Sequence, residues 1–219
     1  MDIRLELVEA RVLGALVEKE LTTPDYYPLT LNGLTLACNQ RSARDPVMNL
    51  DEKTVARALE SLRERRLTRM LSGADMRVPR HYHLLSEALS LAPPELAALA
   101  VLILRGPQTV GEIRGRCSRM HAFADLAQTE QTLAELAGRP APLVVELPRQ
   151  PGRKEPRFAH LLCGAPELPV DGEGPVDPIT LEVRAENERL ARLEEELDEL
   201  RQAFQALRQE FAQFRAQFE

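Results

Sequence analysis

Apolar positions along the first 86 residues recur three times at helical spacing and then change to a strand pattern. The first helix is marked by Leu5, Val8, Val12 and Leu16, and a proline-containing break at residues 22–28 ends it. Three helices followed by a two-stranded hairpin are typical of a winged helix, a variant of the helix-turn-helix motif. The later elements are predicted as a helix over 31–38, a helix that follows Asn49 and ends near Arg66, and strands near 67–71 and 77–84.

The same order of elements returns in residues 87–165. The run Pro79–Leu85 recurs as Pro156–Leu162, with Pro, Arg, His and both Leu aligned at an offset of 77. Apolar positions of the second and third helices recur at offsets of 79 and 74, a drift expected where loops take small insertions. We therefore predict two tandem winged-helix domains, residues 1–86 and 87–165. Each is near the lower size limit for an independent core, so the two are expected to pack together.

Helix starts are also predicted from capping patterns. Asn49 and Glu52 have capping-box-like spacing before the third helix, and Thr109 and Glu112 have it before the second helix of the second copy. Strands of the second copy are expected near 143–147 and 157–162.

The last 40 residues carry a heptad pattern instead. The apolar residues that alternate spacings of three and four are Leu190, Leu193, Leu197, Leu200, Phe204, Leu207, Phe211, Phe214 and Phe218. With Leu190 at position a, three of the four g–e′ pairs of a parallel dimer are attractive. We predict self-association through a coiled-coil helix at 180–219, after an acidic, Pro- and Gly-containing linker at 166–179. The alternative is one amphipathic helix folded back on the repeats, and the order of the oligomer stays open.

The predicted fold class is therefore mainly α with small β-hairpins. The net charge of −6 is unevenly distributed: residues 1–165 hold 22 Lys and Arg against 20 Asp and Glu, whereas residues 166–219 hold 6 against 14. The near-neutral repeats permit nucleic-acid binding but do not by themselves predict it.

Three runs in the repeats resemble the YceH-like proteins of bacteria. They are Ala37–Met48, Glu9–Gly14 and Arg105–Thr109, and the resemblance covers roughly residues 3–165. It implies a tandem winged-helix fold, as the hydrophobic pattern also predicts. It implies no activity, because the family offers no catalytic motif to transfer onto these residues.

A DNA surface is predicted on the first repeat. In a winged helix the third helix enters the major groove and the hairpin contacts the backbone. Residues 39–83 hold 10 basic and 6 acidic residues, and Arg57 is placed to read a guanine. The alternative is a solvated helix face on which Arg57, Glu60 and Glu64 are neighbours. The predicted contact residues are Arg41, Arg44, Lys53, Arg57, Ser61, Arg77 and Arg80.

The second repeat is the weaker candidate for DNA, because its third helix turns Glu130 and Glu135 outward beside Gln128 and Gln131. Its long basic hairpin loop adds Arg149, Arg153 and Lys154, which can contact a backbone, but packing or a protein partner is the favoured role. The leading hypothesis is a self-associating DNA-binding protein, with transcriptional regulation as its role. The alternative is a non-enzymatic protein–protein scaffold.

Other chemistry is sparse. Cys38 and Cys117 fall at equivalent repeat positions on apolar helix faces, which favours buried thiols in a reducing cytoplasm over a redox or metal role. His81 and His83 point the same way along a strand, but only His83 recurs, as His160, which favours a structural histidine over a metal ligand. We expect no enzymatic activity, no metal and no cofactor. With no signal peptide or membrane span recognised, we expect a cytoplasmic protein without a membrane partner.

The pair Tyr26-Tyr27 lies in a loop flanked by prolines. It is either a stacking platform for bases or, more commonly, a cap on the core beneath the loop.

Overall fold

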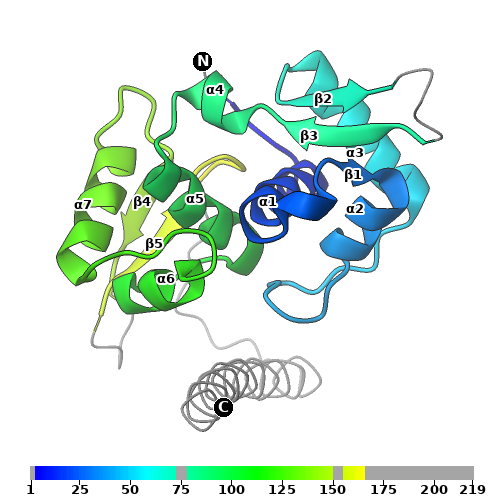
Figure 1. Cartoon of the computed structure of the whole chain (residues 1–219). Coiled ribbons are helices and arrows are strands. Elements are labelled where there is room, and N and C mark those ends of the chain that lie inside the picture. Colours follow the sequence, from blue (N-terminus) through cyan, green and yellow to red (C-terminus); the bar gives the residue numbers. More distant parts are fainter. Residues whose placement is uncertain (1–2, 73–77, 150–154, 166–219) are drawn as a thin grey trace, which may run out of the picture. The chain divides into compact units, whose positions relative to one another are not determined.

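The computed structural model describes residues 3–72, 78–149 and 155–165, which are mostly helical with two small antiparallel sheets (Figure 1). They belong to one compact unit that extends to residue 168. The predicted linker at 166–179 and the predicted coiled coil at 180–219 lie outside the described residues. The first half contains α1 (Leu7–Thr22), the 3₁₀ turn η1 (Pro24–Tyr26), β1 (Leu29–Thr30), α2 (Leu31–Cys38), α3 (Glu52–Glu64), β2 (Thr68–Leu71) and β3 (Arg80–His83). The second half contains α4 (Leu85–Leu89), α5 (Pro93–Arg105), α6 (Val110–Cys117), α7 (Leu126–Ala137), β4 (Val144–Leu147) and β5 (Arg157–His160).

The sequence repeat is also a structural repeat. The helices α2 and α6 correspond residue for residue at the offset of 79, and the strands β3 and β5 at the offset of 77. The starts of α3 and α7 differ by 74 residues. These are the offsets at which the sequence motifs recur, so the matched helices and strands follow one another in the same order in both halves.

The two sheets also match. The first has the order β1-β3-β2, with Leu29 opposite His81 and Thr68 opposite His83. The second pairs β4 with β5, and an isolated bridge between Gln108 and Phe158 takes the place of β1. The strand β1 was not expected from the sequence, because two residues are too few to show a strand period.

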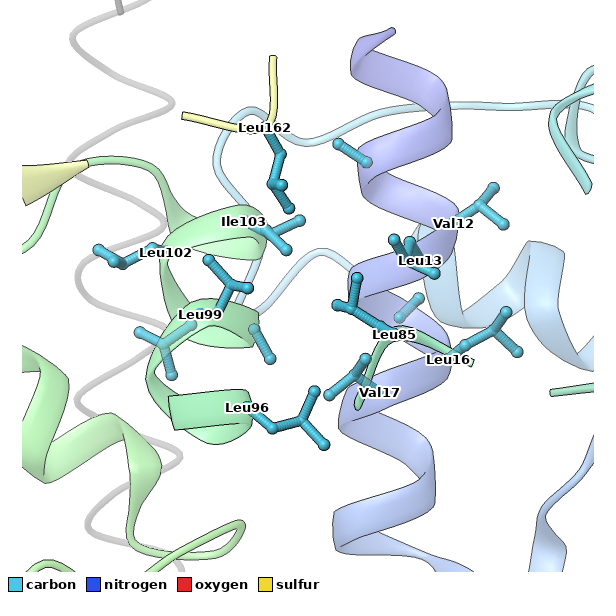
Figure 2. Close-up of a cluster of buried hydrophobic side chains, with 14 of the residues drawn as sticks. Val12, Leu13, Leu16, Val17, Leu85, Leu96, Leu99, Leu102, Ile103 and Leu162 are labelled. Carbon is cyan, nitrogen blue, oxygen red and sulfur yellow. The ribbon is translucent and has the colours of Figure 1, made fainter. Parts of the chain in front are cut away.

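The helices α1 and α5 lie side by side at the centre. Figure 2 shows Leu13 and Val17 of α1 turned toward α5, with Leu96, Ile103, Leu85 and Leu162 in the space between the helices, while Val12 and Leu16 point to the other side of α1. Nine consecutive residues of α1, Glu9–Val17, are buried, as are ten of α5, Glu95–Leu104. A helix that is buried all round lies inside a core. Gly14 allows the close approach, because a Cβ there would lie 2.7 Å from the Ile103 side chain.

Each half then adds its own layer on the central pair. The helix α3 packs on α1, and α7 packs on α5. Figure 1 shows α3 and α7 on opposite sides of the α1–α5 pair. Among the described residues, no helix is both long and apolar enough to cross a bilayer.

The helix starts follow the capping patterns in part. The reciprocal box at α6 is present: the Thr109 amide donates to Glu112 Oε2 at 2.8 Å, and the Glu112 amide donates to Thr109 Oγ1 at 3.2 Å. At α3 the predicted box is wrong. The cap is Asp51, whose Oδ1 accepts from the Thr54 amide at 2.7 Å, because the helix begins directly after it.

Candidate nucleic-acid interface

The outward face of α3 presents two cations one helical turn apart. Lys53 and Arg57 are both exposed, and neither makes a hydrogen bond or an ion pair with a described residue. The pKa of the neighbouring Asp51 carboxyl is lowered first by its hydrogen bonds with Thr54 and then by the charges of Arg57 and Lys53. Farther along α3 the face becomes mixed, because Arg63 pairs with Glu60 at 3.4 Å.

The two arginines of the loop before α3 differ in their exposure to solvent. Arg41 is exposed, as predicted for a phosphate contact. The Arg44 side chain is fully buried, and its guanidinium donates to Glu18 at 3.0 and 2.6 Å and to the Ala37 carbonyl at 2.9 and 3.1 Å. A phosphate would have to displace these partners, so the surface that we propose below omits Arg44.

Ser61 is also omitted, because it turns toward α1 rather than toward solvent. Its hydroxyl donates to Glu9 Oε1 at 2.5 Å, and Glu9 Oε2 accepts from the Glu6 amide at 2.8 Å. The serine therefore joins the start of α1 to α3. Position 61 was expected outward because it lies one turn beyond Arg57, but the core side of α3 is wide enough to include it.

On the hairpin, Arg80 has a structural contact. It is partly buried and donates from Nη1 to the Pro28 carbonyl at 2.8 Å. Its counterpart Arg157 donates to the Pro107 carbonyl at 2.7 Å, so the same contact occurs in both halves. A repeated internal bond is better explained by strand docking than by phosphate binding. Arg77 lies outside the described residues.

The second half presents a different face. Gln128, Glu130, Gln131 and Glu135 are exposed along α7, as predicted. Arg149 is exposed at the start of the hairpin loop, whereas Arg153 and Lys154 lie outside the described residues. Figure 1 shows α3 and α7 on opposite sides of the central pair, so the two exposed faces belong to separate surfaces.

A hollow of about 220 Å³ between α3 and the strands of the first sheet was not found from the sequence. Its apolar part is formed by Leu31, Leu59 and Met70, and Arg63 and His81 lie among its other lining residues. The hollow follows from the pairing register of β2 and β3, which the sequence does not show. Met70 lies directly opposite His81, so both side chains share the face of the sheet that turns toward α3.

His83 and Tyr27 have structural partners. His83 Nε2 lies 2.5 Å from Glu20 Oε2, and its Nδ1 accepts from the Leu85 amide at 3.2 Å. The Tyr27 hydroxyl accepts from the His83 amide at 2.8 Å, and burial raises the pKa of Tyr27. Tyr27 therefore caps the core, while its neighbour Tyr26 is 75% exposed.

The cysteines do not form a reactive or metal-binding set in this structure. Burial raises the pKa of both Cys38 and Cys117 to about 12, so each remains a neutral thiol near pH 7. Within residues 3–72, 78–149 and 155–165, no three His, Cys, Asp or Glu side chains come together as a metal site.

Two of the three motif runs, Glu9–Gly14 and Ala37–Met48, meet at an internal junction directly before the third run. Arg11 of α1 donates to the Cys38 carbonyl at 3.1 Å and to the Pro46 carbonyl at 2.6 Å. The Asp45 amide donates to the Leu104 carbonyl at the end of α5, at 2.8 Å. These runs thus join the loop before α3 to both central helices, which is a packing role.

Comparisons with known proteins agree on one family. The family model described as "Protein of unknown function, DUF480" matches residues 5–153. The chain is 59% identical to UPF0502 protein GSU0233 of Geobacter sulfurreducens and 57% identical to a UPF0502 protein of Geotalea daltonii, in each case over 100% of both chains. It is 56% identical to a UPF0502 protein of Opitutus terrae, over 74% of this chain and 70% of the relative. The YceH-like name suggested by the motif runs is not among these names and stays a prediction.

Proposed function

The chain belongs to the DUF480 family, and from its own geometry we propose that it is a DNA-binding protein of the winged-helix kind. The order of elements in the first half, α1–β1–α2–α3–β2–β3 with a β1-β3-β2 sheet, supports this proposal. The second half repeats that order, with the Gln108–Phe158 bridge in place of β1.

One observation carries the proposal: Lys53 and Arg57 are exposed on one face of α3, and neither makes a hydrogen bond or an ion pair with a described residue. In a winged helix this face enters the major groove. The two cations would release counterions from phosphates, and Arg57 would also reach a guanine edge. Arg41, exposed at the loop before α3, would add a backbone contact.

Self-association belongs to the same proposal. The heptads at 190–218 would bring together two or more copies, each with one DNA-reading helix, since α3 and α7 of one chain lie on opposite sides of the central pair (Figure 1). A regulator of transcription is the role that we assign to such a protein.

The second candidate function is a protein–protein scaffold, and the face of α7 favours it. Glu130 and Glu135 are exposed there, and Glu135 accepts a hydrogen bond from Gln131 at 3.0 Å. An acidic face repels phosphate but suits a basic protein partner.

The test is binding of the full chain to random-sequence duplex DNA over a salt series. We expect affinity that falls steeply with salt, and Lys53→Ala combined with Arg57→Ala should lower the slope of log affinity against log salt by about two. Arg119→Ala, which removes an exposed cation of the second half that is not among the predicted contact residues, is the matched control and should leave the slope unchanged. No binding by the wild type at low salt would leave the scaffold as the better account.

A further inference from the structure

The hollow beside α3 is lined by both apolar and polar side chains. Its apolar lining, which we call its floor, is Leu31, Leu59 and Met70, so an occupant needs an apolar body. The space of about 220 Å³ is below the roughly 300–1,000 Å³ of pockets that take drug-sized ligands, which favours a small group. Ala56, on the α3 side, leaves part of this space open because its side chain is short.

The edge of the hollow offers hydrogen-bond donors. The Arg63 side chain is 51% exposed, and its only hydrogen-bond partner among the described residues is Glu60, at 3.4 Å. A pair this exposed contributes little, and a guanidinium has five N–H donors, so Arg63 keeps donors for a ligand. Burial and then the charge of Arg63 lower the pKa of His81, so its ring is neutral near pH 7 and donates one N–H.

We propose that this hollow binds one sugar–phosphate unit of a DNA strand, with the sugar on the apolar floor and the phosphate held by Arg63 and His81. This inference rests on the proposed function and adds a second contact region to it. A deoxyribose is a small ring with apolar edges, and the adjoining phosphate is an anion that a guanidinium binds well. The site lies between the helix proposed for the major groove and the hairpin, where a backbone would pass.

Glu60 limits the strength of this contact. Its carboxylate shares the edge of the hollow with Arg63 and would repel a phosphate there. Removing that charge would also release the guanidinium. The proposal therefore makes opposite predictions for two neighbouring residues of α3, whereas a general loss of fold would weaken binding in both variants.

The experiment measures fluorescence anisotropy of a labelled random-sequence duplex with the full chain over a salt series. We expect Arg63→Gln to weaken binding severalfold and lower the salt slope by about one, and Glu60→Gln to strengthen binding. Ala56→Leu, which fills the hollow without changing charge, should weaken binding at an unchanged slope. Arg119→Gln, at an exposed cation after α6 that is not among the predicted contact residues, is the matched control and should match the wild type.

The outcomes separate this inference from the proposed function. If the wild type binds and the Lys53/Arg57 double variant loses affinity while Arg63→Gln and Ala56→Leu match the wild type, the hollow is not a backbone site and the helix contact stands. If the wild type does not bind at low salt, the proposed function fails and this inference fails with it. Thermal unfolding of each variant confirms that the fold is kept.

Discussion

Glu18 and Arg44 form a two-pronged ion pair inside the first half, with Nη1–Oε1 and Nη2–Oε2 distances of 3.0 and 2.6 Å. Arg44 lies on the loop that leads to α3, and Glu18 lies on the central helix α1. Asn39, at the start of the same loop, is hydrogen-bonded to Leu50 near its end. The Asn39 side chain donates to the Leu50 carbonyl, at 2.7 Å, and accepts from the Leu50 amide, at 2.8 Å. The position of α3 is thus set by the loop that precedes it.

Loss of Arg44 should therefore reduce stability. Arg44→Met leaves the Glu18 carboxylate 13% exposed and without its main partner, and we expect a loss of roughly 3–5 kcal/mol of unfolding free energy. Arg41→Met, an exposed change in the same loop, should stay within about 0.5 kcal/mol of the wild type. Urea unfolding measures both, and equal midpoints for the two variants would contradict a structural role of Arg44.

The Glu18–Arg44 ion pair also makes the stability of the fold depend on pH. Burial by itself would raise the pKa of Glu18, but the hydrogen bond and charge of Arg44 lower it below the ordinary value of 4.5. Its stabilising effect is therefore complete above pH 4.5 and is lost as the pH falls through the lower pKa of the folded state. Urea midpoints between pH 5.5 and 2.5 should fall less steeply in Glu18→Gln than in the wild type. Parallel curves would show that Glu18 does not titrate in this way.

His160 predicts a loss of stability at milder acidity. Burial lowers its pKa from 6.5 to about 4, and its Nδ1 has no hydrogen-bond partner in the described part of the chain. Because the folded state resists protonation, stability present above pH 6.5 should decline toward pH 4, by at most about 3 kcal/mol. His160→Gln should flatten this region of the pH–stability curve. An unchanged slope between pH 6.5 and 4 would assign the decline to other groups.

The contact between α1 and α5 should not tolerate a methyl group at Gly14. In Gly14→Ala the new Cβ would meet Ile103 at 2.7 Å and Leu104 at 3.1 Å, and we expect a loss of about 1–3 kcal/mol. Gly115→Ala is the control, because nothing lies within 4 Å of its Cβ, and it should be neutral or stabilising by up to about 1 kcal/mol. Chemical denaturation compares the two, and a stable Gly14→Ala would mean that the helices separate at little cost.

Substitutions at the core positions of the predicted coiled coil test self-association. Leu200→Asp with Leu207→Asp places charges at two core positions, and we expect monomers in sedimentation velocity. Gln202→Asp with Gln209→Asp adds the same charges at the outward f positions and should keep the wild-type oligomer. Oligomers that persist in the first variant would place self-association in the repeats.

The sequence predicted helices and strands well where the element is long enough to show its hydrophobic period. The helix expected over 31–38 is Leu31–Cys38, and the strands expected near 67–71 and 143–147 are Thr68–Leu71 and Val144–Leu147. The two-residue β1 and the short α4 were missed, since neither spans enough residues to show a period. Among the predicted contact residues, Arg41 and Arg44 are three positions apart in a polar loop, and only one of them is exposed.

What the sequence by itself determined is the internal repeat and the order of the longer helices and strands, because these depend on spacing along the chain. Only the tertiary structure decided which arginines are available to a partner. An arginine side chain has the same polarity whether it ends up exposed or buried, so the sequence does not distinguish the two cases. Its burial depends on carboxylates and carbonyls that folding brings close. Arg44 meets Glu18, 26 residues earlier in the chain, and Arg80 meets the Pro28 carbonyl, 52 residues earlier. The opposite placement of α3 and α7 is decided at the same level, because it follows from the packing of α1 against α5 around Gly14.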